Sequence, residues 1–492
     1  MRPIPGYACA MLALTLLVAC DGDDGALDPS ARVESVAVVP GIVSLVVGDT
    51  LRLTTIARGR MGNPLTGQLA TWATASPGVV TVSTDGLVTA VGPGAAMVSA
   101  TIDAKVGTST MTVSPKFPAA VFTSVASGGA HTCGLTNGGI ASCWGRGEAG
   151  QLGVPPPVTT CLSNQDFPCG LVPFPVNGGL SFTQLAGGGA HTCGLTSDGA
   201  AWCWGSNTNG QLGDGTLSAR SSPVAVATDA KFSQIGAGFD HTCALTSAGA
   251  AWCWGMNNVG QLGIGTRTRQ LTPVAVNAPT GVTFDQLSPG GPENAGFTCA
   301  RSTNGDAWCW GSNAQGALGL GTRDFLLHGV PERVSGQLEF ATIVTGKGVH
   351  VCAVATDGIV YCWGGNRNGA LGDGTGTDSF SPLKVSGVTL QQLTVGGYLE
   401  GAHTCGLTSS GEAWCWGDND VGAVGDGTIG GRRLPVAVAG GHRFSMLSAG
   451  LRHTCGRRTD GVVYCWGSGR TGQLGTNSTI SSALPMRVAG QP

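Results

Sequence analysis

The chain has 492 residues, enough for more than one domain, and carries a formal net charge of -3 with only 11% charged residues. This charge balance provides no basic surface, so we expect no nucleic acid partner. Glycine occurs 83 times and no helical heptads are visible, which favours an all-β chain with many turns.

The first twenty residues have the pattern of an export signal. Arg2 precedes an apolar stretch, Ala8 to Ala19, that is too short to span a bilayer as a mature helix. The string Leu17-Val18-Ala19-Cys20 resembles the lipobox of bacterial lipoproteins, in which the cysteine is lipidated and becomes the first residue. We therefore predict a lipoprotein signal peptide over 1–20 and a membrane anchor at Cys20. An ordinary signal peptide with an incidental cysteine is the alternative.

A tether and a cysteine-free segment come next. Residues 21–30 are acidic and contain glycine, which predicts a flexible tether. Residues 31–115 have short β-branched runs separated by Gly and Pro, which indicate the strands of a β-sandwich. Through Val47-Gly48-Asp49-Thr50, Thr71-Trp72 and 86–94, this segment resembles the bacterial immunoglobulin-like domains of group 2. The resemblance implies a spacer or an adhesive module, and we expect a spacer because no reactive constellation is visible.

A cysteine pair then recurs seven times. In every pair the second cysteine lies ten positions after the first and is followed by Trp-Gly, and a glycine lies six positions after the first. A repeat of this kind indicates a propeller or solenoid, because one small sheet cannot bury its faces alone. The pairs are Cys133 with Cys143, Cys193 with Cys203, Cys243 with Cys253, Cys299 with Cys309, Cys352 with Cys362, Cys405 with Cys415, and Cys455 with Cys465.

The spacing within each pair matches a β-hairpin. A three-residue loop ending in Gly199 places Cys193 opposite Cys203 on a non-hydrogen-bonded pair, where Cα atoms are about 4.5 Å apart, within disulfide range. We therefore predict seven disulfides within repeats, and an eighth between Cys161 and Cys169 in the first repeat. The alternative is a metal site, but structural zinc sites use close pairs such as CxxC, which are absent, so we expect no metal and no cofactor.

Each repeat supplies four strand-like pieces, so seven repeats predict a seven-bladed β-propeller over 122–488. The strings HTCGLTSDG, WGSNTNGQLGDGT and SPVAV resemble the repeat family named for the regulator of chromosome condensation. The resemblance extends over all seven repeats. The paired cysteines depart from the intracellular members of that family and suit a secreted form.

Two other residues repeat with the cysteines. A histidine lies two positions before the first cysteine in six repeats, and a tryptophan follows every second cysteine. Catalysis needs different groups converging on one point, whereas pseudo-symmetry distributes identical groups around a ring. We therefore interpret both as structural. The histidines would form hydrogen bonds from blade to blade or from side chain to backbone, rather than a metal or proton site, and the tryptophans would pack between blades. The histidines are His131, His191, His241, His350, His403 and His453, with Phe297 in the fourth repeat.

The repeats differ at one end of the predicted propeller. Loops after the first and third strands emerge at that end, and the cysteine hairpin turns emerge at the other. The large irregularities, in 155–174, 290–296, 323–328 and 397–401, all belong to the first end. Variable aromatic residues on rigid loops suit protein recognition, although neutral drift of the loops is the alternative. The predicted partner-binding residues are Asp166, Phe167, Glu293, Phe325, Leu326, Leu327, Tyr398, Leu399 and Glu400.

No nucleophile–base pair is visible, so we expect a monomeric, non-enzymatic lipoprotein of a bacterium, exported to the cell surface or periplasm, that binds another extracellular or periplasmic protein. The family resemblance implies two alternatives: inhibition of an extracellular enzyme such as a β-lactamase, and guanine-nucleotide exchange. Exchange would require a nuclear GTPase that an exported protein does not meet. Light sensing by a plant member uses clustered tryptophans, but residues 450–454 read Gly-Leu-Arg-His-Thr and lack the tryptophan of its GWRHT motif.

Overall fold

The computed structural model describes residues 32–114, 120–155, 160–161, 167–399 and 401–491. The chain divides into two compact units, 1–115 and 116–492. Every regular element in the described residues is a β-strand, so the protein is all-β. None of the described residues forms a helix long and apolar enough to cross a membrane. The predicted signal peptide, Cys20 and the tether lie outside the described residues.

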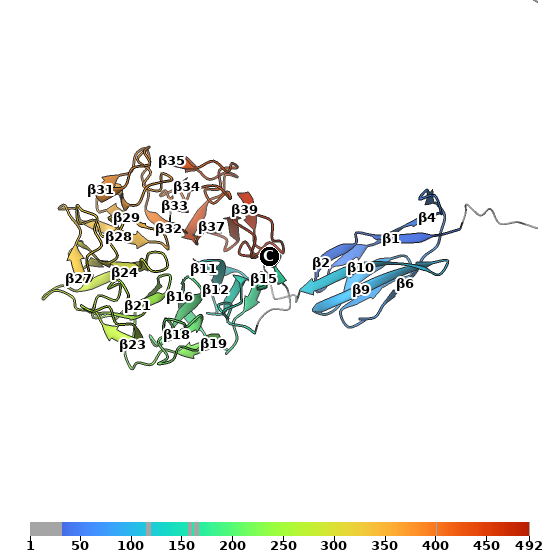
Figure 1. The fold of residues 1–492 in the computed structure, drawn as a ribbon, viewed down its shortest axis with the longest axis horizontal. Helices are drawn as coiled ribbons and strands as arrows, with labels where there is room; N and C mark the ends of the chain where they lie inside the picture. The colour runs from blue at the N-terminus through green and yellow to red at the C-terminus, as the bar shows by residue number, and fades with distance from the viewer. Residues whose placement is uncertain (1–31, 115–119, 156–159, 162–166, 400, 492) are drawn as a thin grey trace, which may run out of the picture. The chain divides into compact units, whose positions relative to one another are not determined.

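The first unit has a four-stranded sheet, β2-β10-β9-β6, and two three-stranded sheets, β1-β4-β5 and β3-β8-β7 (Figure 1). Alternate residues of β9 are buried, as expected when one face of a sheet covers a core. Val80, Val88, Val98 and Met111 are fully buried in that core. The strands are β1 (Ser35–Val39), β2 (Ile42–Val46), β3 (Thr50–Arg52), β4 (Thr54–Arg58), β5 (Pro64–Leu65), β6 (Thr71–Thr74), β7 (Val80–Val82), β8 (Leu87–Ala90), β9 (Gly94–Ile102) and β10 (Lys105–Ser114).

The second unit contains seven antiparallel sheets that follow one another along the chain. Figure 1 shows them arranged around a common centre, with the first strand of each sheet innermost. These inner strands are β11 (Phe122–Ser127), β16 (Phe182–Gly187), β20 (Gln234–Ala237), β24 (Phe284–Gly290), β28 (Phe340–Thr345), β32 (Gln392–Tyr398) and β36 (Phe444–Ala449).

The second and third strands of each sheet form the cysteine hairpin. In the second sheet Cys193 pairs with Cys203 and Leu195 with Ala201, which is the expected register. Gly199 has a positive φ of 78° at the turn, as a three-residue loop requires. The hairpins are β12 (His131–Thr136) with β13 (Ala141–Arg146), β17 (His191–Thr196) with β18 (Ala201–Gly205), β21 (His241–Leu245) with β22 (Ala251–Gly255), β25 (Phe297–Ser302) with β26 (Ala307–Gly311), β29 (His350–Ala355) with β30 (Val360–Gly364), β33 (Gly401–Leu407) with β34 (Ala413–Gly417), and β37 (His453–Arg458) with β38 (Val463–Gly467).

The fourth strand is outermost in every sheet but the first (Figure 1). In the first sheet the fourth strand pairs with an additional strand, β14, so that sheet has five strands. The outer strands are β15 (Phe167–Pro175) with β14 (Thr160–Cys161), β19 (Arg220–Ala225), β23 (Gln270–Ala275), β27 (His328–Arg333), β31 (Ser379–Lys384), β35 (Arg432–Ala437) and β39 (Ser482–Arg487).

All eight expected cysteine pairs are disulfide-bonded, and every disulfide lies within one sheet. The seven hairpin disulfides join residues whose Cα atoms are 4.0 to 4.1 Å apart, the short cross-strand separation of a non-hydrogen-bonded pair. The eighth, between Cys161 and Cys169, joins β14 to β15 with a Cα separation of 5.8 Å. The hairpin disulfides join Cys133 to Cys143, Cys193 to Cys203, Cys243 to Cys253, Cys299 to Cys309, Cys352 to Cys362, Cys405 to Cys415, and Cys455 to Cys465.

The sheets pack against one another through the repeated tryptophans. The fully buried Trp254 of the third sheet packs against Cys193, Cys203 and Leu212, which belong to the second repeat. Its Nε1–H donates to the Gln211 carbonyl at 3.0 Å. The same donation at 2.8 to 3.0 Å links each of the seven tryptophans to the preceding repeat, and that of the first sheet, Trp144, to the seventh. The tryptophans are therefore structural core residues.

The buried histidines add a second link between sheets. The Thr192 hydroxyl donates to the Gln151 carbonyl at 3.0 Å, so it accepts from the Nε2–H of His131, which is 2.9 Å away. Six such histidine–threonine pairs join successive sheets at 2.8 to 3.0 Å, including His453 of the last sheet and Thr132 of the first. Burial lowers the pKa of these histidines to about 3, or about 4 for His403, so they are neutral.

Only one junction lacks this pair in the described sheets. There Phe297 of the fourth sheet and Val351 of the fifth replace both the histidine and the threonine. Replacing both partners of a buried hydrogen bond by apolar groups leaves no unsatisfied donor, which explains why the two substitutions occur together.

Candidate partner-binding face

The two ends of the second unit differ as the sequence predicts. The hairpin turns, such as 197–199, form one end, which we call the hairpin end. The loops after the first and third strands form the other, which we call the loop end. Of the predicted partner-binding residues, Asp166 and Glu400 lie outside the described residues, and Glu293 is exposed. Five apolar side chains at the loop end are exposed, by 86% for Phe325, 72% for Leu326, 42% for Leu327, 36% for Tyr398 and 42% for Leu399.

Phe167 contributes little exposed surface. It is only 9% exposed, because it lies in β15 beside the disulfide of Cys161 and Cys169 and beneath the Arg146 guanidinium, 5.0 Å from its ring centroid. Phe167 and Arg146 line a small hollow of about 380 Å³ together with Leu451, Arg452 and other residues. The aromatic ring is therefore mainly a structural support for the first sheet.

The loop that presents Phe325 and Leu326 is held by a charged clamp. His328 begins β27 opposite Gly311, where Arg220 stands opposite Gly205 in the second sheet. Its Nε2 lies 2.8 Å from Asp324 Oδ1 and its Nδ1 lies 2.7 Å from Glu332 Oε1. Burial opposes the charge on the ring, but the hydrogen bonds to the two carboxylates outweigh it and raise the pKa of His328.

Tyr398 reaches across the centre of the second unit. It ends β32 in the sixth sheet, yet its ring centroid lies 5.8 Å from that of Phe239 in the third repeat. Such a tilted aromatic pair stabilises by about 0.5 to 1.5 kcal/mol beyond its buried area. Leu399, which follows, forms an isolated bridge with Gly348 of the fifth repeat. The loop after β32 is therefore anchored to other repeats.

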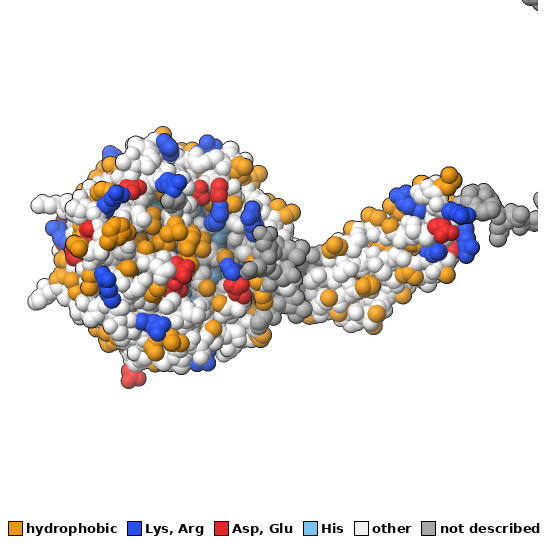
Figure 2. Space-filling view, in the orientation of Figure 1, with side chains coloured by type: hydrophobic (Ala, Val, Ile, Leu, Met, Phe, Trp, Pro, Cys, Tyr) orange, Lys and Arg blue, Asp and Glu red, His pale blue; other side chains and the backbone are white. Residues whose placement is uncertain are grey.

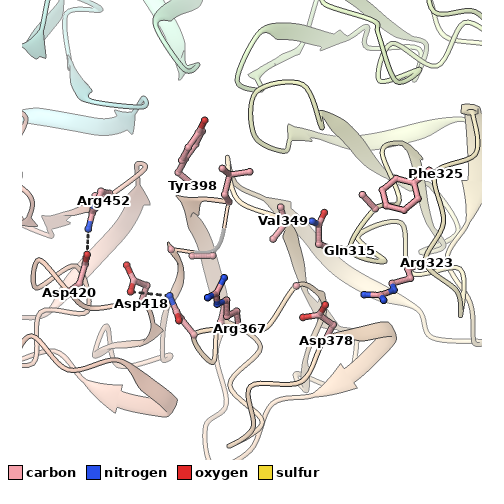
Figure 3. Close-up of a pocket in the computed structure, with 17 residues that line it drawn as sticks. Gln315, Arg323, Phe325, Val349, Arg367, Asp378, Tyr398, Asp418, Asp420 and Arg452 are labelled. Atoms are coloured by element: carbon pink, nitrogen blue, oxygen red, sulfur yellow. Dashed lines mark hydrogen bonds and ion pairs between the residues drawn. The ribbon is translucent and has the colours of Figure 1, made fainter.

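These residues surround a cavity of about 930 Å³ (Figure 3). Its volume falls within the range of small-ligand and peptide side-chain pockets. The apolar part of its wall includes Phe325, Val349, Tyr398, Leu399 and Ala402, and the charged part includes Arg323, Arg367, Asp378, Asp418, Asp420 and Arg452. Figure 2 shows apolar and charged side chains interspersed on this side of the unit. Phe325, Tyr398 and Leu399, from segments far apart in sequence, thus converge on one cavity.

Three arginines and three aspartates line the cavity. Arg452 forms an ion pair with Asp420. Asp418 receives a hydrogen bond from the Asn368 side-chain amide at 3.2 Å. Burial, and then the negative charge of Asp420, raise the pKa of Asp418 to about 6. Elsewhere at the loop end, burial and then Glu293 raise the pKa of Asp240 to about 6 as well.

Lys347 is a buried residue that the sequence reasoning did not single out. It is 8% exposed, its Nζ lies 3.4 Å from the Ser127 carbonyl of the first sheet, and burial lowers its pKa to about 8. A signal was present, because Lys347 stands where Gly128 and Gly188 stand in other repeats, three positions before the histidine. In the described residues no three His, Cys, Asp or Glu side chains are arranged to hold a metal ion.

The fold and this face define a β-propeller that follows an immunoglobulin-like domain. Residues 172–491 match the RCC1-like domain family, and single regulator of chromosome condensation repeats match at 122–151 and 143–195. Residues 32–113 match the bacterial Ig-like domain of group 2. The RCC1-like match covers more than half of the sequence, so this chain belongs to the RCC1-like domain family.

Several known proteins are similar to the chain. The ultraviolet-B receptor UVR8 of Arabidopsis thaliana is 32% identical over 64% of this chain and 69% of the relative. The E3 ubiquitin-protein ligase HERC2 of Homo sapiens is 28% identical over 64% of this chain, but that region is only 5% of HERC2. The structure of Prp20p from Saccharomyces cerevisiae, with a TM-score of 0.62 and 22% identity, covers 72% of this chain and 87% of its own. Human WBSCR16 has a TM-score of 0.59 and 22% identity, over 68% and 86%. These two structures support the fold alone.

Proposed function

We propose that the seven sheets are the blades of a closed seven-bladed propeller whose loop end binds another extracellular or periplasmic protein, and that the chain is a non-enzymatic bacterial lipoprotein. The exposed apolar cluster around the cavity, Phe325, Leu326, Leu327, Tyr398 and Leu399, carries the proposal. Large apolar side chains on anchored loops are what the centre of a protein interface needs. Contacts of β11 with β36 and β37 support closure of the ring.

The loops are held in place before any partner binds. His328 clamps the loop of Phe325, and the Phe239 ring and Gly348 hold the loop of Tyr398. A surface held in its binding conformation loses less conformational entropy on association. The hairpin end, by contrast, consists of similar short turns with polar residues, which distinguish partners poorly.

The proposed location follows from the cysteines and the first residues. Eight disulfides favour an oxidising compartment, where such bonds form and persist, and the lipobox string ends at Cys20. Several acyl chains on one residue would anchor the chain stably. Cys20→Ala should stop incorporation of labelled palmitate and release the chain from the membrane fraction. Unchanged labelling of the variant would exclude Cys20 as the lipid site.

Alanine substitution at the two ends tests the proposed binding face. Partners captured from culture medium and periplasmic extract are measured by calorimetry against each variant. Phe325→Ala, Leu326→Ala and Tyr398→Ala should each weaken binding by about 1 to 4 kcal/mol where the side chain is an anchor. The controls Asp198→Lys, Asp357→Lys and Asp460→Lys at the hairpin end should change it by less than about 0.5 kcal/mol. Equal sensitivity of both ends, in variants with unchanged Tm, would contradict the proposal.

A further inference from the structure

We propose that His328 is a positioning residue whose proton holds the loop of Phe325 and Leu326, so that the loop end binds its partner more weakly once the ring is deprotonated. This inference rests on the proposed function and states how that binding is regulated. Both ring nitrogens face carboxylate oxygens, Nε2 at 2.8 Å from Asp324 Oδ1 and Nδ1 at 2.7 Å from Glu332 Oε1. An ionised carboxylate only accepts, so both hydrogen bonds form only when both nitrogens carry a proton.

One of these two bonds must fail when the ring becomes neutral, because a neutral imidazole keeps a single N–H. The nitrogen that loses its proton then turns a lone pair toward the lone pairs of a carboxylate. The side chain of His328 is only 10% exposed, so water satisfies the two groups poorly. Loss of the proton therefore favours separation of the ring from one of the carboxylates.

Asp324 is the carboxylate that the neutral ring releases. Its Oδ1 also accepts the Leu326 N–H at 3.0 Å, and its Oδ2 accepts the Asn313 side-chain amide at 2.9 Å. Glu332 accepts from His328 alone among the described residues. A carboxylate that already accepts several hydrogen bonds is the weaker base, so the neutral ring keeps its proton on Nδ1, toward Glu332. The bond that fails is therefore the one that holds the exposed apolar loop.

Two other repeats hold the corresponding loop with a charge that does not titrate. His328 begins β27 at the register position where Arg220 begins β19 and Arg432 begins β35. The two arginines pair with Asp214 at 3.0 Å and with Asp426 at 2.6 Å. Arginine stays charged in proteins, whereas histidine loses its charge near neutral pH. The titratable side chain thus occurs in the repeat that presents the exposed apolar loop.

The charged groups around His328 determine the direction of the effect. Burial opposes the charge on the ring, but the hydrogen bonds to the two carboxylates outweigh it and raise the pKa of His328 above the ordinary 6.5. The ring is therefore charged at pH 6 and loses its proton as the pH rises. The charged groups on the segments that contact β27 and its loop are Asp324, Glu332, Arg323, Arg333 with its partner Asp306, and Arg267 and Arg269 of the third repeat, which follow the contact of Gly265 with Gly329.

Nitrogen-15 NMR of the full chain labelled at histidine tests the protonation directly. Both ring nitrogens of His328, assigned from the signal that His328→Gln lacks, should carry a proton at pH 6 and only Nδ1 at pH 9. The exchange protection of the Leu326 amide, corrected for its intrinsic rate, should fall about five-fold or more over the same range. A neutral ring at pH 6, or equal protection at both pH values, would overturn the inference.

Glu332→Gln tests whether the proton controls binding. The new amide can donate to Nδ1 of a neutral ring, whose Nε2–H then stays on Asp324, so the loop remains held at pH 9. Affinity for the captured partner, measured by calorimetry, should fall about five-fold or more from pH 6 to pH 9 in the unchanged chain, and should not fall in this variant. Glu412→Gln, at an exposed glutamate paired with Arg443 at the hairpin end, is the matched control and should keep the fall.

The variant also separates His328 from other groups that titrate in this range. The pKa values of Asp240 and Asp418 are about 6, and that of Lys347 is about 8. A fall in affinity that persists in Glu332→Gln would belong to such groups and would overturn the inference. If Phe325→Ala leaves partner capture unchanged, the proposed function fails, and the NMR and exchange measurements still decide whether the proton holds the loop.

Discussion

The immunoglobulin-like unit has no cysteine and no histidine in residues 32–114, whereas the propeller contains eight disulfides and all eight histidines of the chain. The first unit is stabilised by one apolar core around Val98 and Met111. The second has a separate thin core between each pair of sheets, and every one includes a disulfide or a tryptophan. A small core needs covalent or polar reinforcement, so the two units should respond differently to reductant and to acid.

Reduction should have the largest effect. Each hairpin disulfide closes a loop between residues ten apart, which stabilises by at most about 3 kcal/mol, and the propeller has seven of them. The full chain, unfolded and reduced and then returned to buffer with reductant, should lose the calorimetric transition of the propeller and keep that of the immunoglobulin-like unit. Refolding without reduction is the control. Recovery of both transitions after reduction would show that the disulfides are dispensable.

Acid should have the next largest effect, again on the propeller. The buried histidines have pKa values near 3 in the folded state, below the ordinary 6.5, so the unfolded chain binds more protons. The stability that depends on these neutral histidines is fully present above pH 6.5. As the pH falls from 6.5 toward 3, the free energy of unfolding decreases by about 1.4 kcal/mol per pH unit for each histidine. Tm measured from pH 7 to pH 4 should fall for the propeller and change little for the first unit. Parallel shifts of both would contradict this assignment.

One histidine–threonine pair gives a smaller and more specific test. Thr298→Val leaves the Nε2–H of His241 buried without an acceptor, which should cost about 1 to 3 kcal/mol. Adding His241→Phe reproduces the Phe297 and Val351 combination found at the next junction, and should restore part of the loss. Denaturant unfolding of the two single variants and the double variant measures the coupling. If the double variant loses as much unfolding free energy as the two single variants together, the explanation given for the Phe297 and Val351 junction is excluded.

The sequence predicted features that depend on local spacing. Cysteines ten apart, with a glycine at the turn, define a hairpin whose register follows from the chain geometry. The pairing of Cys193 with Cys203 could therefore be predicted. The contact between Phe239 and Tyr398 could not be predicted, because it joins two repeats across the centre of the second unit. For the same reason the loop end could be identified from its irregular segments, but the shared cavity and the charge balance around Asp418 could not. The low exposure of Phe167 depends on the Arg146 guanidinium and on the disulfide beside the ring, which only the packed structure reveals.

Site-specific photo-crosslinking tests the central claim, that the loop end is the recognition face. A benzophenone amino acid is placed at Leu326, which is 72% exposed at the loop end, and in a separate variant at Asp229, which is exposed beside the hairpin end. Both variants are irradiated with the captured partner under the same conditions. The account predicts a crosslinked partner from position 326 and none from position 229. A crosslink from position 229 alone, or equal yields from both, would contradict it.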